Sequence, residues 1–279
     1  ICITKSIIFV KCKRFKEAIE LLKENLILNP DNADLYYSIG YSYQGQEKYQ
    51  QAIKHYKRSI QLDMDNEMAL YELSYCLEIT NQLENAVPFY TQFIDIDPYA
   101  ENAWYNLGTI YHQLSDNKKA IEAFEFAIAI KEDFASAYFN LANVFIEEEM
   151  FEKAIKNFEE CLEHEAPSAE IYCKIGECYE QTKSYDLAFD YFKKALKLDK
   201  NREDALIGIG SILYEKDKMM EAIFYITKAK EINPKNYFYW HILANAEYKL
   251  GNEAHCIEAF EKAVENIHHH YAIFKPWGY

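Results

Sequence analysis

Three consecutive histidines and seven cysteines are the residues of this chain whose types could bind a metal or act as nucleophiles. Neighbouring residues on a helix point in different directions, so His268, His269 and His270 cannot present three ligands to one ion. A purification tag or a chance run explains the histidines better than a metal site does. We therefore predict no metal site.

The cysteines are scattered through the chain and show no C-x-x-C pair, which indicates neither a zinc site nor a disulfide framework. They are Cys2, Cys12, Cys76, Cys161, Cys173, Cys178 and Cys256. This usage fits a reducing compartment. Cys173 and Cys178 lie five residues apart and do not align on a helix, so we expect two small buried or half-buried residues. The chain also lacks a Gly-rich phosphate loop, a G-x-S-x-G motif and an H-E-x-x-H motif, so we expect no enzyme activity and no cofactor.

The overall charge narrows the classes of partner. The formal net charge is −15, which disfavours nucleic acid and anionic membrane surfaces, because both need clustered Lys and Arg. No apolar run is long enough to span a bilayer, and "ICITKSIIFV" at the start lacks the arrangement of a signal peptide. We expect a cytoplasmic protein. The first residue is Ile rather than Met, so a missing leader stays an alternative.

One 34-residue unit is repeated along the chain without insertions. Full units begin at residues 33, 67, 101, 135, 169, 203 and 237, after a partial unit at 1–32. Position 8, counted from the first residue of each unit, is always small, and position 24 is large and apolar or aromatic. We expect small residues where two backbones approach and large ones where the space between them must be filled.

Apolar spacing within a unit is helical. In the unit that begins at 101, Trp104, Leu107 and Tyr111 fall on one face, and a second such run begins at Ala120 after the polar break "SDNK". Pro residues at 30, 98 and 234 mark the ends of second helices. Each unit therefore predicts two antiparallel helices joined by a tight turn.

These features resemble the tetratricopeptide repeat (TPR) family. "WYNLGTIY" at 104–111, followed by Ala120 and Phe124, is similar to the W-x2-L-G-x2-Y…A-x3-F pattern of that family. The resemblance implies an all-α, right-handed α-solenoid superhelix over residues 1–279. Residues 271–279 form either a tail or the start of a truncated next repeat, and we expect the chain to be an excerpt of a longer array. Trp104, Tyr138 and Trp240 at position 4 are expected to be buried between the two helices of their own units.

The resemblance also implies that positions 2, 5, 9, 12 and 13 of each unit point into a concave groove. Aromatic rings and amides that would contact an extended peptide there, mainly at positions 5, 6 and 9, are Tyr37, Tyr41, Tyr71, Tyr75, Tyr105, Asn106, Phe139, Asn140 and Asn143. Packing of the rings against neighbouring first helices is the alternative explanation. No Lys or Arg occupies position 5, and Asn143 and Asn245 have Phe139 and His241 as position-5 partners, which disfavours a clamp for a chaperone carboxylate.

The second half of the groove is acidic. Its carboxylates are Glu170, Glu177, Glu180, Asp204 and Glu215. A solvated acidic face is one interpretation, and attraction of a basic segment of a ligand is the other.

We therefore expect a non-enzymatic scaffold that binds a protein or peptide with aromatic or apolar and basic segments. Alternatives are a self-assembling spacer that associates through its ends, and a regulatory arm of a longer protein.

Overall fold

The computed structural model describes residues 2–234 and 237–274, with the side chains of residues 5–234 and 239–265. The described residues form sixteen helices and no strand. The helices are α1 (Cys2–Lys11), α2 (Phe15–Leu28), α3 (Ala33–Gln44), α4 (Tyr49–Leu62), α5 (Glu67–Ile79), α6 (Leu83–Ile96), α7 (Glu101–Gln113), α8 (Asn117–Ile130), α9 (Ala135–Glu147), α10 (Phe151–His164), α11 (Ala169–Gln181), α12 (Tyr185–Leu198), α13 (Glu203–Glu215), α14 (Met219–Ile232), α15 (Tyr237–Lys249) and α16 (Glu253–Phe274).

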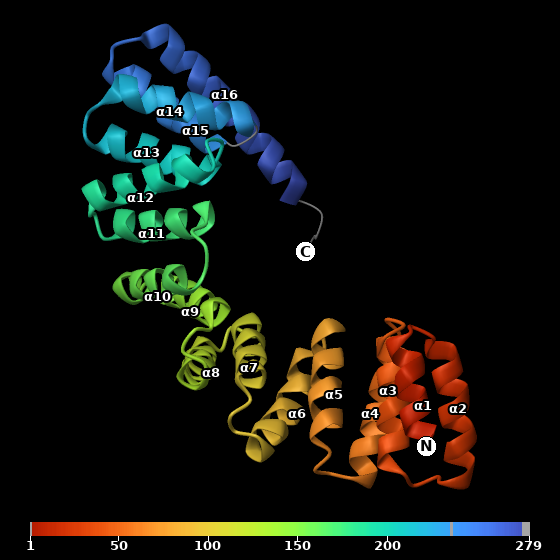
Figure 1. The fold of residues 1–279 in the computed structure, drawn as a ribbon. Helices are drawn as coiled ribbons and strands as arrows, with labels where there is room; N and C mark the ends of the chain where they lie inside the picture. Colours follow the sequence, from red (N-terminus) through yellow and green to blue (C-terminus); the bar gives the residue numbers. More distant parts are fainter. Residues whose placement is uncertain (1, 235–236, 275–279) are drawn as a thin grey trace. The chain divides into compact units, whose positions relative to one another are not determined.

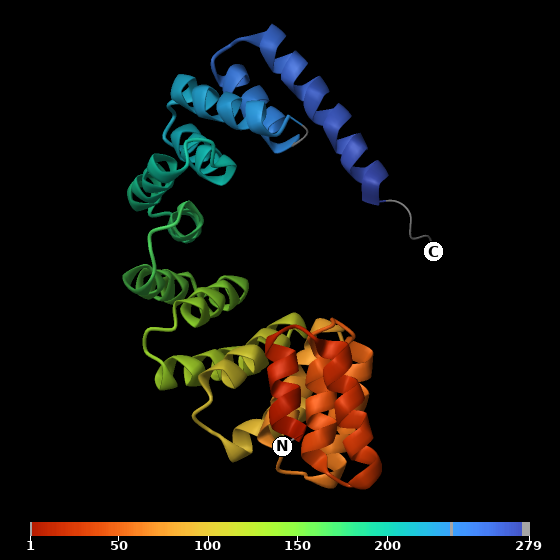
Figure 2. The same cartoon turned by 45° about the vertical axis from the view of Figure 1, so that its right-hand side comes forward.

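Helix pairs are the building blocks of the fold. Each odd-numbered helix from α3 to α15 begins at the residue where the sequence starts a repeat. Helices α3 and α4, α7 and α8, and α11 and α12 pack together as antiparallel pairs (Figures 1 and 2). Second helices also pack against the first helix of the next pair, as α4 does on α5 and α12 does on α13. The predicted all-α solenoid of TPR type is confirmed.

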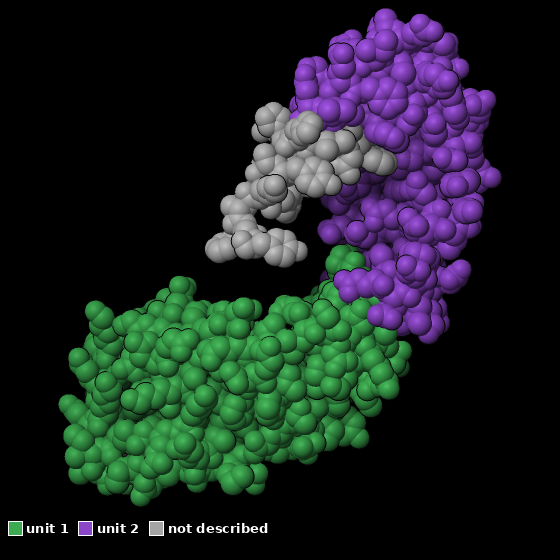
Figure 3. Space-filling model, turned by 180° about the vertical axis from the view of Figure 1, so that it is seen from behind, with its two compact units in different colours: residues 1–144 green, residues 145–279 purple. Residues whose placement is uncertain are grey.

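The chain divides into two compact units, residues 1–144 and residues 145–279, which Figure 3 colours green and purple. The first unit holds α1 to α8 and most of α9, and its first helices α1, α3 and α5 contact one another in order. In the second unit α11, α13 and α15 do the same. Each unit therefore presents a row of first helices.

Close approach of the paired helices explains the small residue at position 8. The position-24 rings Tyr56, Phe124 and Phe192 are completely buried. A Cβ atom placed on Gly108 would lie 2.8 Å from the ring of Phe124, so the ring fills the space that a side chain would need. Position 8 and position 24 are thus complementary halves of one contact.

The turns between paired helices repeat as faithfully as the helices do. Eight of the described residues, spaced at 34, have a left-handed backbone: Lys13, Glu47, Asn81, Ser115, Glu149, Lys183, Asp217 and Gly251. After each of them the next N–H donates to the carbonyl five residues earlier, as Asp116 does to Tyr111 at 2.8 Å. This is the Schellman motif that ends a helix.

The expected burial of the position-4 aromatics is wrong. Trp104, Tyr138 and Trp240 are half-buried. Phe124 already fills the space between the helices, so the indole of Trp104 lies at its margin, where it stacks on the exposed ring of Phe126 with centroids 4.6 Å apart. Its Nε1 donates to the carbonyl of Pro98 at 3.0 Å.

The two ends of the repeat array differ from the sequence expectation in detail. Helices α1 and α2 form a pair, and the buried Ser6 takes the small-residue place of position 8. Helix α16 spans 22 residues and runs to Phe274, so residues 271–274 continue this helix instead of opening another repeat. The side chains of the three histidines and the remainder of the predicted tail lie outside the described residues.

Candidate binding groove

A groove of about 930 Å³ lies in the first unit, along α1, α3 and α5. Aliphatic side chains from α1 and α5, among them Ile7, Val10 and Met68, contribute to its lining. The short polar turn between helices sets the angle of each pair, and the 34-residue repeat brings equivalent faces of successive first helices side by side. The groove is therefore built by residues at repeated positions.

Three of the predicted groove residues line this space: Tyr37, Tyr41 and Tyr75. The ring of Tyr37 packs between Tyr41, at a centroid distance of 6.1 Å, and the buried Tyr56, at 5.8 Å. Burial raises the pKa of Tyr37, so its hydroxyl stays protonated. Tyr41 is 41% exposed, which leaves an aromatic surface open to a ligand.

A polar network fixes a carboxylate in the same groove. The Gln44 Oε1 atom accepts hydrogen bonds from the Tyr56 hydroxyl at 2.6 Å and from the Cys76 thiol at 3.3 Å. Because its oxygen is used in this way, the Gln44 side-chain amide points its Nε2 toward Glu72, and the Glu72 Oε2 atom accepts a hydrogen bond from it at 2.6 Å. Burial raises the pKa of the Glu72 carboxyl, and the hydrogen bond from Gln44 partly offsets that effect.

Tyr71 and Tyr105 are half-buried and take part in the fold. Tyr71 packs on Tyr90 and on Phe93 with centroids 5.9 and 5.4 Å apart. Tyr105 packs on Phe124 at 5.8 Å and on Phe134 at 5.0 Å. The alternative of structural packing therefore accounts for much of the surface of both rings.

The predicted asparagines donate within the protein. Asn106 Nδ2 donates to the hydroxyls of Tyr90 at 3.0 Å and Tyr71 at 3.4 Å, and Asn140 Nδ2 donates to the hydroxyl of Tyr105 at 3.0 Å. The bonds to Tyr71 and Tyr105 link adjacent first helices, and the bond to Tyr90 links α7 to the second helix α6. The amide nitrogens that we expected to meet a peptide backbone are thus engaged with neighbouring repeats.

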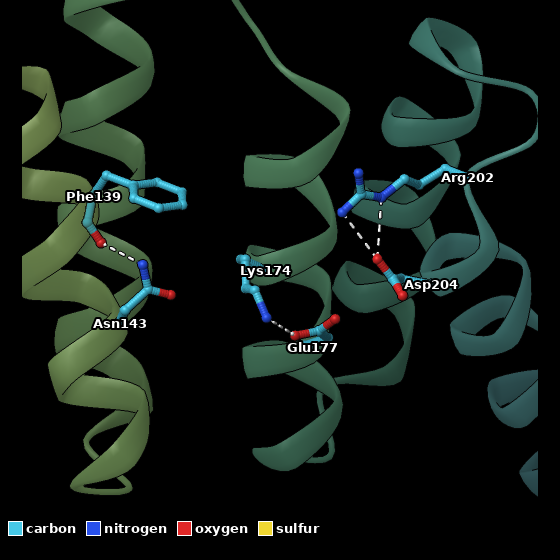
Figure 4. A network of polar contacts seen from close by, with 6 residues as sticks. All are labelled: Phe139, Asn143, Lys174, Glu177, Arg202 and Asp204. Atoms are coloured by element: carbon cyan, nitrogen blue, oxygen red, sulfur yellow. Dashed lines mark hydrogen bonds and ion pairs between the residues drawn. The ribbon is translucent and has the colours of Figure 1, made fainter. Parts of the chain in front are cut away.

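Asn143 forms its bond inside its own helix. Its Nδ2 donates to the carbonyl of Phe139 at 3.0 Å, as Figure 4 shows. The ring of Phe139 is half-buried. In α15, Asn245 likewise turns its amide toward the ring of His241, 3.3 Å away. Neither asparagine meets a Lys or Arg at position 5.

Two cations interrupt the predicted acidic stretch of the second unit. Lys174 pairs with Glu177 at 3.0 Å, and Arg202 pairs with Asp204 at 3.0 Å (Figure 4). Glu170 and Glu215 are exposed. The half-buried Glu180 has its pKa raised to about 7, chiefly by burial and further by the charges of Glu177 and Glu215.

Sequence reasoning missed several groove residues. Glu72 occupies position 6, the same position that singled out Asn106 and Asn140, so comparison at that position could have found it. Gln44 is at position 12, which was expected to face the groove. The sequence indicates only a partial repeat at 1–32, so it does not predict that α1 contributes to the groove.

Other kinds of site find no support in the described part of the chain. Among described residues, no group of three or more His, Cys, Asp or Glu is placed to hold a metal ion. Cys173 and Cys178 are buried free thiols, as expected, and burial raises the pKa of each to about 12. None of the described helices combines the length and apolar character needed to cross a bilayer.

Comparisons with known proteins agree with this architecture. Family models described as tetratricopeptide repeat match residues 33–65, 69–99, 101–134, 133–201, 203–236 and 239–266, and one described as TPR repeat matches residues 8–47. A comparison with curated protein sequences found no match.

Solved structures with the same fold include MamA, which is 27% identical with a TM-score of 0.58 over 61% of this chain and 93% of its own. YrrB, described as a TPR protein with an unusual peptide-binding site, is 19% identical with a TM-score of 0.55 over 63% of this chain and 91% of its own. A tetratricopeptide repeat protein from Parabacteroides merdae is 18% identical with a TM-score of 0.58 over 88% of this chain and 97% of its own. With its repeated helix pairs and these matches, the chain belongs to the tetratricopeptide repeat family.

Proposed function

We propose that the chain is a non-enzymatic scaffold that binds a peptide segment of a partner protein in the groove along α1, α3 and α5. The observation that carries this proposal is the groove of about 930 Å³ lined by Tyr37, Tyr41 and Tyr75. Ligand sites are typically concave and mostly apolar, with a few polar groups that orient the ligand. This groove has that composition.

The physical basis of binding would be rigid aromatic surface. A tyrosine side chain offers a large contact area and loses few rotamers on binding, and its hydroxyl can still bond to a peptide. YrrB, which shares the repeat fold, is described as having an unusual peptide-binding site. Because YrrB is only 19% identical to this chain, it is a precedent for the fold alone. The proposal therefore rests on the residues of the groove described above.

The remaining predicted residues would contribute unequally. Tyr71, Tyr105 and Phe139 are half-buried, so they would offer only part of each ring. In the second unit, Glu170, Glu180 and Glu215 would attract basic residues of a partner, because Glu177 and Asp204 already hold their own cations. We assign the main binding energy to the α1, α3 and α5 groove.

Selection from a displayed library of random nine-residue peptides on the purified full chain tests the proposal. The Tyr41→Ala/Tyr75→Ala variant removes two rings from the groove and should lose at least about tenfold in affinity for the selected peptides. Both side chains are at least partly exposed, so the fold should remain intact by circular dichroism and thermal melting.

Phe126→Ala is the matched control. Phe126 is a 53% exposed aromatic residue on α8 that does not line the groove, so its loss should leave peptide affinity unchanged. Selected peptides that bind the folded double variant as tightly as the original chain would contradict the proposed groove.

A further inference from the structure

We propose that the groove recognises a cationic side chain, Lys or Arg, of the bound peptide through the carboxylate of Glu72. This inference rests on the proposed function and names the chemistry of its ligand. It places the basic contact in the aromatic groove of the first unit, whereas the sequence alone favoured the acidic stretch of the second.

The first argument is that Glu72 is held in place before any ligand arrives. Gln44 donates to its Oε2 at 2.6 Å, and Gln44 is itself locked because its Oε1 takes the protons of Tyr56 and Cys76. A carboxylate that is already oriented loses little conformational entropy when it meets a ligand. Its second oxygen, Oε1, is the acceptor available to a cation.

The second argument is that the protein supplies no cation to this carboxylate. Within the described part of the chain, Glu72 has no ion pair with Lys, Arg or His. Lys11 and Lys13 also line the groove, but so do Asp34 and Glu47, so carboxylates outnumber ammonium groups there. A half-buried carboxylate without a partner favours a ligand that brings a positive charge.

The repeat itself provides a comparison. Position 6 of the seven full units is occupied by Ser38, Glu72, Asn106, Asn140, Lys174, Gly208 and Ile242. Glu72 is the only acid among them. Asn106 and Asn140 use this position to bond tyrosine hydroxyls, and Lys174 pairs with Glu177, so only at Glu72 does the position retain an uncompensated charge.

The third argument comes from the walls of the groove. Tyr37, Tyr41 and Tyr75 line the same space as Glu72. The face of an aromatic ring attracts a cation, and the contact strengthens where water is excluded. Tyrosine rings around a fixed carboxylate therefore suit an ammonium or guanidinium group whose aliphatic stem packs on the rings.

The experiment repeats the peptide selection with Glu72→Gln. The new amide oxygen can still accept from Gln44, so the network and the fold should persist, and circular dichroism and thermal melting verify this. Glu125→Gln is the matched control, because it removes the same charge from an exposed residue of α8 that does not line the groove. The original chain and Glu125→Gln should enrich peptides with Lys or Arg at one position, and Glu72→Gln should not.

A selected peptide then provides the direct measurement. Replacing its Arg by citrulline, or its Lys by acetyl-lysine, should weaken binding to the original chain at least about tenfold, as expected for a charge-assisted hydrogen bond. The same replacement should change binding to Glu72→Gln by less than about threefold. A double-mutant cycle of this kind isolates the contact between the two groups.

Two different results separate the failure of this inference from that of the proposed function. If the selected peptides need Tyr41 and Tyr75 but show no preference for Lys or Arg, the role of Glu72 is overturned while the proposed groove stands. The same holds if the preference for Lys or Arg persists in Glu72→Gln. Peptides that bind without Tyr41 and Tyr75, or no enriched peptide at all, would overturn both.

Discussion

At the scale of single residues, Trp104 and Tyr105 show how neighbouring aromatics share the work of the fold. Both are half-buried. Trp104 stacks on Phe126, which is itself exposed, whereas Tyr105 packs between Phe124 and Phe134 and accepts a hydrogen bond from Asn140. The residue that the sequence assigned to the fold and the one it assigned to binding therefore both contribute to stability.

We predict that Trp104→Ala and Tyr105→Ala lower the free energy of unfolding by similar amounts, about 2–3 kcal/mol each. A partly buried ring loses less than a fully buried one, which typically costs about 3–5 kcal/mol. Urea unfolding followed by circular dichroism measures both variants. If Trp104→Ala costs more than Tyr105→Ala by about 2 kcal/mol or more, the fold depends chiefly on Trp104, and Tyr105 is left for the groove.

Glu180 should lower the stability of the fold as the pH rises, whereas most carboxylates in folded proteins raise it. Its folded-state pKa is raised to about 7 by burial and by Glu177 and Glu215, above the ordinary value of 4.5. The favourable contribution of its protonated form is fully present below pH 4.5 and is lost as the pH rises through about 7.

We therefore predict that Glu180→Gln stabilises the protein at pH 8, by about 1 kcal/mol after allowance for solvent screening, and has little effect near pH 4. Urea unfolding at the two pH values measures the difference. Glu125→Gln removes an exposed carboxylate from α8 and should show no such pH dependence. An equal effect of Glu180→Gln at both pH values would exclude a raised pKa as the cause.

At the scale of helices, the turn between the two helices of a pair places a left-handed residue at the same position in every repeat. The backbone φ is +58° at Lys183 and +78° at Gly251. A side chain in this conformation costs about 1 kcal/mol, which glycine avoids because it has no Cβ. The turn geometry is thus kept even where the residue type opposes it.

Replacing Lys183 by glycine should raise the free energy of unfolding by about 0.5–1 kcal/mol, because relief of the backbone strain exceeds the entropy that glycine adds to the unfolded chain. Lys183→Ala is the control, because alanine keeps a Cβ in the same left-handed conformation and should therefore not raise the free energy of unfolding. Gly251→Ala should be destabilising by a similar amount. Thermal melting of the three variants tests this, and equal effects of Gly and Ala at position 183 would refute it.

At the scale of the whole molecule, stability should be local. Helix contacts join a pair to its neighbours along the chain, as α6 contacts α7 and α12 contacts α13. In such an array the total stability approximates a sum of repeat and interface terms. Damage in one repeat should therefore fade within a few repeats.

Phe124→Ala tests this locality. Removal of this completely buried ring should leave a cavity and cost about 3–5 kcal/mol. Amide hydrogen exchange should show the largest loss of protection in α7 and α8, a smaller loss in α6, and little change in α13 and α14. A uniform loss of protection along the chain would indicate a single cooperative unit instead.

The sequence by itself determined the repeat, the starting residue of each first helix and the buried contact between positions 8 and 24. These features depend on local helical periodicity and on side-chain volume, which recur in register in each copy. The family pattern at 104–111 follows from the same regularity. None of them requires knowledge of which residues meet across repeats.

Only the tertiary structure decided how individual polar and aromatic side chains are used. The bonds of Asn106 and Asn140 to tyrosine hydroxyls, the pairing of Arg202 with Asp204, and the fixed carboxylate of Glu72 all depend on rotamers and on the packing of neighbouring elements. Helical period places a residue on a face but does not say which partner its polar atoms find there. For that physical reason the fold could be predicted from the sequence, whereas the chemistry of the groove required the contacts between repeats.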